Sequence, residues 1–215
     1  MKVGRVTMAA VAAALVGAFL LAAVWYRREQ AREAARAVAA NESRLVRDYS
    51  PTLGPADAPV TVVEFLDPEC EACRAMHPIV KRVLEEHEGR VRLVVRYMPF
   101  HQNSALAASL LEAARAHGKY WEALDTFFLR QPEWASHHAP RPELLYDYAV
   151  LVGLDQARWK AEAGNPEWQR RLRQDAEDGA ALGVTRTPTL FVNGRRLEQL
   201  GYEPLGAAVE AALPR

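Results

Sequence analysis

The sequence has little cysteine and no excess charge of either sign. Two cysteines among 215 residues exclude a disulfide-stapled scaffold and a four-cysteine zinc site. Lysine and arginine total 27, as do aspartate and glutamate, so the formal net charge is +0. This balance leaves no basic field to neutralise phosphates and argues against a nucleic-acid partner. The chain also has no Walker loop, no GxGxxG motif and no internal repeat.

The remaining composition is that of a folded protein. Half of the residues are hydrophobic and a quarter are charged, which excludes a wholly disordered chain. The length predicts one or two domains.

One long hydrophobic run stands at the N-terminus. Val6–Tyr26 contains 21 residues without a single charge, and a helix of that length spans about 30 Å, the thickness of a bilayer core. Trp25 and Tyr26 end the run, where interfacial aromatics are expected. A cleaved signal peptide is the alternative, but the run ends without a small-x-small cleavage site. We therefore expect residues 1–26 to form one uncleaved transmembrane helix.

Residues 27–50 are rich in Ala, Glu and Arg, which predicts a mostly solvated helix. We interpret this segment as a juxtamembrane spacer. A dimerisation or docking helix is the alternative, which the small apolar residues of the segment disfavour. Ser50-Pro51 and Gly54-Pro55 then break the helix and mark a domain boundary.

The pattern from Pro51 onward predicts an α/β domain over residues 51–215. A buried strand, a helix and a second strand form a βαβ unit, and a helical insertion of four or five short helices follows. Asn193-Gly194 then predicts a hairpin. The expected elements are strands at 60–66 and 91–97, a helix at 70–87, the insertion at about 104–182, hairpin strands at 189–192 and 195–197, and a closing helix at 203–213.

The two cysteines form a CxxC motif at the junction of the first strand and its helix. Cys70 is expected at the helix N-terminus, where unpaired N–H groups and the helix dipole favour a thiolate. A thiolate is the species that attacks a disulfide. Cys73 lies one turn further on and is expected to be more buried, where it would resolve a mixed disulfide at Cys70.

Two stretches, Val63–Cys73 and Gly183–Gly194, together resemble the thioredoxin superfamily. The helical insertion between them is similar to the DsbA-like branch, the thiol–disulfide oxidoreductases. This resemblance implies a thioredoxin-like fold over residues 51–215 and a redox-active Cys70–Cys73 disulfide that needs no other cofactor.

The resemblance also assigns three further site residues. Pro188 falls where the family has a cis-proline facing the CxxC, which would expose the backbone of Thr187 to an incoming extended peptide. It would also keep metal ions away from the cysteines. Glu64 lies six residues before Cys70, the place of a buried acid that could take the proton of Cys73. An exposed Glu at a strand edge is the alternative for Glu64, which its apolar neighbours disfavour.

The family's partners are proteins, and its chemistry belongs to oxidising compartments. The resemblance implies unfolded or partly folded protein substrates and a membrane redox partner that resets the CxxC. We therefore expect a single-pass protein of the bacterial inner membrane with its catalytic domain on the periplasmic side. The positive charges oppose this orientation, because more of them follow the hydrophobic run than precede it: Arg27, Arg28, Arg32 and Arg36 against Lys2 and Arg5.

The dipeptide between the cysteines departs from the strongly oxidising members that resemble this chain. They often carry His at the second position, where this chain has Ala72 beside the anionic Glu71. A negative charge next to Cys70 should raise its pKa. This predicts a less oxidising pair and leaves the redox direction open.

Two other functions remain open from the sequence. Cys70, Cys73, Met76 and His77 have the residue types of a soft copper site, although a plain helix surface is the simpler interpretation. A thioredoxin-like module that only binds peptides is the second alternative. His101 and the His137-His138 pair are interpreted as loop residues.

Overall fold

A computed structural model describes residues 25–30, 32 and 41–214. The chain divides into two units, residues 1–43 and 44–215. In the first unit, residues 25–30 are helical, and Trp25 and Tyr26 are exposed. The rest of the hydrophobic run expected to cross the membrane lies outside the described residues. Among the residues that are described, no helix is both long and apolar enough to span a bilayer.

The second unit is built on one mixed sheet with the order β1-β3-β2-β4-β5. The strands β2 and β3 are parallel, and every other neighbouring pair is antiparallel. A parallel pair needs a crossover, which helix α2 (Glu71–Glu86) supplies. The strand bounds are β1 Thr52–Leu53, β2 Val60–Leu66, β3 Val91–Tyr97, β4 Thr189–Val192 and β5 Arg195–Arg196. The predicted βαβ unit and hairpin are therefore confirmed.

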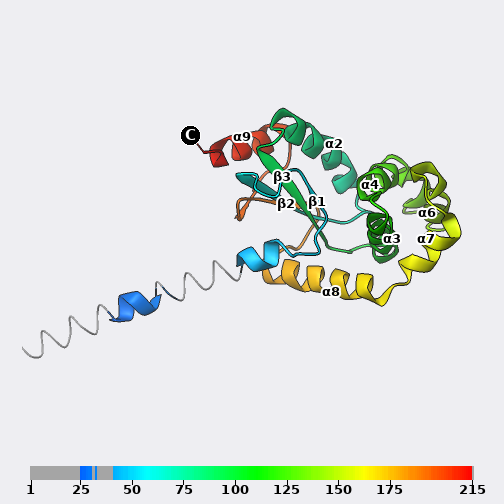
Figure 1. Ribbon diagram of the computed structural model, residues 1–215, viewed down its shortest axis with the longest axis horizontal. Helices are drawn as coiled ribbons and strands as arrows, with labels where there is room; N and C mark the ends of the chain where they lie inside the picture. Colours follow the sequence, from blue (N-terminus) through cyan, green and yellow to red (C-terminus); the bar gives the residue numbers. More distant parts are fainter. Residues whose placement is uncertain (1–24, 31, 33–40, 215) are drawn as a thin grey trace, which may run out of the picture. The chain divides into compact units, whose positions relative to one another are not determined.

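Helices cover both faces of this sheet, with α2 and α9 (Tyr202–Ala212) on one face and α8 (Pro166–Ala181) on the other (Figure 1). The alternation of strand side chains explains the two layers. In β2, Val62 and Leu66 belong to the large core cluster under α2, whereas Val63 and Phe65 belong to a smaller cluster on the α8 side. The predicted α/β architecture is confirmed.

The helical insertion contains more helices than the sequence predicted. Between residues 104 and 182 the structure has six α-helices and one 3₁₀ turn. The short helix α5 begins directly after α4 with Pro132 in its first turn, where proline's missing N–H leaves no helical hydrogen bond unmade. The bounds are α3 Ser104–Ala116, α4 Tyr120–Leu129, α5 Gln131–Trp134, α6 Leu144–Asp147, the 3₁₀ turn Val150–Val152, α7 Gln156–Ala163, and α8 as above.

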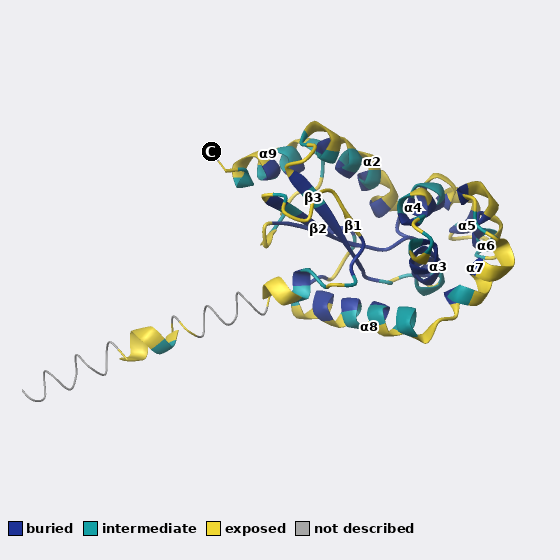
Figure 2. Cartoon of the chain, in the orientation of Figure 1, coloured by how far each residue is buried: buried dark blue, intermediate teal, exposed yellow. Residues whose placement is uncertain are grey.

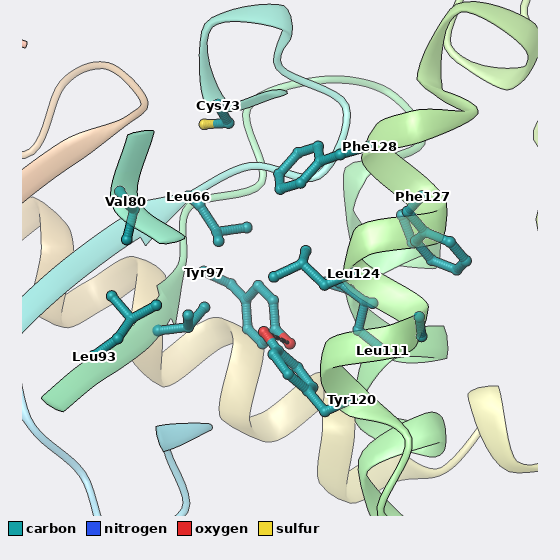
Figure 3. Packing of buried hydrophobic residues seen from close by; sticks show 14 of the residues in the cluster. Leu66, Cys73, Val80, Leu93, Tyr97, Leu111, Tyr120, Leu124, Phe127 and Phe128 are labelled. Carbon is teal, nitrogen blue, oxygen red and sulfur yellow. Dashed lines mark hydrogen bonds between the residues drawn. The ribbon is translucent and has the colours of Figure 1, made fainter. Parts of the chain in front are cut away.

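The insertion is continuous with the core beneath α2. Figure 3 shows Cys73, Leu66 and Phe128 at one end of this packed region and the hydroxyls of Tyr97 and Tyr120 meeting at the other. Those two hydroxyl oxygens lie 2.9 Å apart. Because one core spans both lobes, the insertion supports the strand–helix junction that carries the cysteines.

A buried ion network joins the α8 side to the start of the unit. Arg96 of β3 is fully buried and pairs with Asp175 and Asp178 of α8, each at 2.7 Å. Arg47 donates two hydrogen bonds to Asp178, and the Tyr49 hydroxyl donates to Asp175 at 2.9 Å.

Because of this network, the folded domain begins earlier in the sequence than predicted. The compact unit begins at Arg44 rather than Pro51, and Leu45 is buried in the cluster on the α8 side. The end of the expected spacer is therefore part of the folded unit. The sequence interpretation treated these charges as solvated because their acidic partners lie more than 120 residues further on.

Candidate functional site

The CxxC lies at the N-terminus of α2, where the sequence placed it. Cys70 is the N-cap residue of the helix, and its backbone N–H donates to the Asp67 carbonyl at 3.1 Å. Both thiols are free. Cys73 is fully buried, whereas Cys70 retains 8% exposure. Cys70 is thus the thiol that can meet a second molecule.

The Thr187–Pro188 peptide bond is cis, as predicted. The Cys70 Sγ lies 3.4 Å from the Thr187 carbonyl oxygen, so the fold joins two segments 117 residues apart. In the thiol form, Sγ–H donates to this carbonyl. Thr187, which precedes the cis-proline, therefore borders the sulfur of Cys70 directly.

The two thiols have opposite acidities. Hydrogen bonds to its sulfur, first from Cys73 and then from the Thr187 side chain and the backbone of Cys73 and Ala72, outweigh burial and lower the pKa of Cys70 to about 5. Burial raises the pKa of Cys73 well above its ordinary value, and the hydrogen bond to Cys70 and the Glu64 charge add to that rise. At neutral pH the pair is therefore a Cys70 thiolate and a Cys73 thiol.

Glu71 is not among the main groups that set the acidity of Cys70. The Glu71 side chain is exposed, and its Oε1 lies 3.8 Å from His137 Nε2. Water screens a carboxylate placed there, and the hydrogen bonds at the Cys70 sulfur decide the pKa instead. The pKa of Cys70 therefore lies below its ordinary value even with Glu71 beside it, and the prediction of a less oxidising pair than the strongest oxidants stays a prediction.

Glu64 is buried beneath the cysteines, as the resemblance implied. Its exposed fraction is 2%, and it lies on the face of β2 that Val62 and Leu66 share, because strand side chains alternate. Burial raises its pKa to about 8. The alternative of an exposed edge residue is wrong, since β2 is paired on both sides.

Sequence reasoning missed a polar cluster next to the CxxC. The Asp67 carboxylate accepts hydrogen bonds from the His101 ring at 2.7 Å and from the Ser104 hydroxyl. The Glu69 carboxylate accepts from the backbone and side chain of Asn103 at 2.6 and 2.9 Å. These contacts bind the β3–α3 loop to the strand–helix junction. Asp67 and Glu69 had no role of their own in the sequence-based prediction.

A second missed residue is Gln131 of α5, which is buried. Its Nε2 donates to the carbonyl oxygens of Pro68 and Cys70 at 2.9 and 3.1 Å. The helical lobe therefore holds the strand–helix junction directly.

The surroundings of the cysteines are partly apolar and exposed. Phe100 follows β3 and is 49% exposed, and Leu129 at the end of α4 is 77% exposed. A surface groove of about 570 Å³ runs between α2 and α4. Its lining residues are Arg74, His77, Pro78, Lys81, Arg82, Glu85, Asp125, Phe128 and Leu129.

Met76 and His77, two residues of the copper alternative, make contacts of another kind. Met76 is buried in the core, and His77 Nε2 lies 2.6 Å from Asp125 Oδ1. Within the described part of the chain, no three His, Cys, Asp or Glu side chains converge on a common point suited to a metal.

Two comparisons by sequence identify relatives of this chain. The family model described as thioredoxin matches residues 47–211. A Na⁺/H⁺ antiporter NhaA from Herminiimonas arsenicoxydans is 38% identical over 144 residues, which is 67% of this chain and 22% of the antiporter. NhaA 3 from Salinispora tropica is 37% identical over 163 residues, 74% of this chain and 24% of that protein. The chain thus spans about a quarter of the length of these relatives.

Solved structures agree with the family model. A thioredoxin-like oxidoreductase from Silicibacter pomeroyi superposes with a TM-score of 0.69 and 28% identity, covering 79% of this chain and 96% of that one. Oxidised BdbD from Bacillus subtilis gives 0.69 and 25%, covering 76% and 92%. Wolbachia pipientis α-DsbA1 shares the fold, with a TM-score of 0.72 at 18% identity, covering 80% and 95%. The chain therefore belongs to the thioredoxin superfamily, and its fold is that of the DsbA-type thiol–disulfide oxidoreductases.

Proposed function

We propose that this protein is a thiol–disulfide oxidoreductase that exchanges disulfides with extracytoplasmic proteins through Cys70 and Cys73. The observation that carries the proposal is the opposed acidity of the two thiols, with the pKa of Cys70 lowered to about 5 and that of Cys73 raised. Such a pair has one sulfur that attacks and leaves readily and one that holds its proton.

In the oxidising direction, a substrate thiolate attacks Cys70 Sγ of the Cys70–Cys73 disulfide. The S–S bond breaks, a mixed disulfide forms at Cys70, and Cys73 leaves as a thiolate that takes a proton. A second substrate thiolate attacks the substrate sulfur of the mixed disulfide, and Cys70 leaves as a thiolate. The substrate has then lost two electrons and two protons, and the CxxC holds both electrons.

Glu64 is suited to manage the proton at Cys73. Its pKa of about 8 leaves the carboxyl mostly protonated at neutral pH, so it can donate to the departing Cys73 thiolate. In the reverse direction the carboxylate can accept the Cys73 proton when that thiol resolves a mixed disulfide.

The acidity of Cys70 favours the oxidising direction. Stabilising its thiolate stabilises the reduced form of the pair, which raises the reduction potential. A low leaving-group pKa also speeds the release of Cys70 from the mixed disulfide. We propose that the pair donates disulfides to its substrates.

The surface around Cys70 suits an unfolded protein substrate. The backbone of Thr187 borders the sulfur and can pair with an extended peptide in the manner of an added strand. The exposed Phe100 and Leu129 offer apolar contacts that need no defined sequence.

Trapping of the intermediate tests the exchange reaction. In Cys73→Ser, an oxidised peptide should remain bound to Cys70 as a stable mixed disulfide, which mass spectrometry detects. Cys70→Ser should form no adduct and should lose exchange with its fold intact by circular dichroism. Exchange that persists in Cys70→Ser contradicts the proposed reaction.

We also propose that residues 1–26 anchor the domain to the bacterial inner membrane, with residues 44–215 in the periplasm. A membrane redox protein would then reoxidise the CxxC. The uncharged run Val6–Tyr26 supports the anchor. Protease treatment of spheroplasts should digest the domain, whereas protection until the membrane is lysed would contradict this orientation.

A further inference from the structure

A histidine–carboxylate pair lies beside the active-site thiol. His101 stands in the loop between β3 and α3, and its Nδ1 lies 2.7 Å from Asp67 Oδ2. The Asp67 side chain is fully buried, whereas the His101 side chain is 36% exposed. The imidazole therefore reaches a buried carboxylate on one side and solvent on the other.

Asp67 is fixed against the cysteines. Its backbone N–H points at Cys73 Sγ over 3.4 Å, and its carbonyl accepts from the Cys70 N–H at 3.1 Å. Its carboxylate accepts backbone N–H groups of Glu69 and Phe100 at 2.9 and 2.8 Å. These contacts fix both the backbone and the carboxylate of Asp67 at the strand–helix junction.

Protonation of His101 changes the net charge of the Asp67–His101 pair by one unit. With a neutral imidazole, the Asp67 carboxylate is an uncompensated negative charge next to Cys70 and opposes the thiolate. With an imidazolium, the pair is neutral, and the partly exposed ring carries the positive charge. The titratable groups that act on His101 are Asp67, Cys70 and Glu69.

We propose that His101, held by Asp67, is a positioning residue that stabilises the Cys70 thiolate electrostatically and makes the reduction potential of the CxxC depend on pH. This inference rests on the proposed exchange chemistry. When His101 loses its proton, the thiolate becomes less favourable and the pair becomes a weaker oxidant.

The acid–base state of His101 supports the inference. Burial opposes its charged form, but the hydrogen bond and charge of Asp67, followed by the charges of Cys70 and Glu69, outweigh burial and raise the pKa of His101 above its ordinary value. The coupling is reciprocal, because two interacting charges shift each other's equilibrium by the same factor. Oxidation removes the thiolate, so the pKa of His101 should fall when the disulfide forms.

The test measures the His101 pKa by NMR in the full chain in detergent micelles, reduced and oxidised. The expected pKa is higher in the reduced protein by about 0.5–1 unit, as for a partly exposed pair of opposite charges. This measurement needs no variant. Equal values in both redox states, within about 0.2 unit, would overturn the inference, because such a shift corresponds to less than twofold coupling.

Matched variants extend the test to the thiol. His101→Gln should raise the pKa of Cys70 by the same 0.5–1 unit or so, as measured by thiolate absorbance. It should lower the equilibrium constant for oxidising glutathione roughly three- to tenfold, or about 15–30 mV. The control is His117→Gln, since His117 Nε2 forms a similar pair with Glu162 at 2.7 Å at the C-terminal end of α3, and it should change neither quantity. An unchanged Cys70 pKa in His101→Gln would overturn the inference.

These results separate the two proposals. If the wild-type protein exchanges disulfides and His101→Gln leaves the Cys70 pKa and the potential unchanged, this inference fails and the proposed function stands. If the wild-type protein exchanges no disulfides but the His101 pKa differs between redox states, the coupling stands and the proposed function fails.

Discussion

At the scale of single residues, burial and hydrogen bonding give two neighbouring cysteines different protonation states, a thiolate and a thiol. Cys70 and Cys73 are one helical turn apart, yet only the first lies where a hydrogen-bonded thiolate is stable. Glu64 adds a buried proton site whose charge acts on Cys73. Reactivity at this site is therefore set by which sulfur the core encloses.

Glu64 makes stability depend on pH. Its folded pKa of about 8 exceeds the ordinary value of about 4.3 in an unfolded chain, so the folded state binds more protons between these values. Stability from this group is complete below pH about 4.3 and is lost as pH rises to about 8. At about 1.36 kcal/mol per unit, the loss is on the order of 5 kcal/mol.

Replacing the acid should flatten this dependence. Glu64→Gln should show a smaller fall in unfolding free energy between pH 5 and 8, measured by urea denaturation. Glu210→Gln, an exposed change on α9, should retain the wild-type slope. The account of Glu64 is wrong if both variants keep that slope.

The residues found from the sequence are those that a local motif identifies. Cys70 and Cys73 were identified by their spacing, and Thr187 and Pro188 by the resemblance of Gly183–Gly194 to the thioredoxin superfamily. His101 and Asp67 carry no such local signal, because they lie 34 residues apart and meet only when β3 aligns beside β2. Gln131 was missed for the same reason, being 61 residues from Cys70.

At the scale of elements, α8 closes the face of the sheet opposite α2. Figure 2 shows this helix buried along one side and exposed along the other. Gly179 lies where the helix approaches the sheet, and a Cβ there would come within 2.7 Å of Met98 Sδ and 3.1 Å of Phe65 Cε1. The close approach therefore requires a residue without a side chain.

Gly179→Ala should destabilise the protein by about 1–2 kcal/mol, because the added methyl group overpacks the layer. Gly206→Ala in α9 is the matched control, since nothing lies within 4 Å of its Cβ position. That change should be neutral or stabilising by up to about 1 kcal/mol, as expected for alanine in a helix. Urea unfolding of both variants measures the difference. Equal effects would mean that α8 does not pack against Phe65 as described.

The elements themselves were well predicted where hydrophobic runs are short and β-branched, as in β2 and β3. The insertion was harder, because proline and short polar stretches divide it into pieces such as α5 and α6. The boundary at Pro51 was wrong because long-range ion pairs, not composition, decide where the fold begins.

At the scale of the whole molecule, residues 44–50 belong to the domain that they precede. A chain starting at Pro51 loses the buried Leu45, the Arg47–Asp178 pair and the Tyr49–Asp175 hydrogen bond. It also leaves Asp178 with one cationic partner fewer. We expect its unfolding free energy to be about 3–5 kcal/mol below that of a chain starting at Arg44, as measured in urea. Equal stabilities would contradict the assignment of residues 44–50 to the fold.

The reduction potential of the Cys70–Cys73 pair tests the central claim most directly. The full chain is equilibrated with glutathione buffers at pH 7, and its thiols are counted after alkylation. A thiolate stabilised as strongly as that of Cys70 predicts a potential above about −200 mV, toward the −120 mV of the strongest oxidants. A value near or below about −250 mV, in the range of thioredoxin, would contradict a disulfide donor.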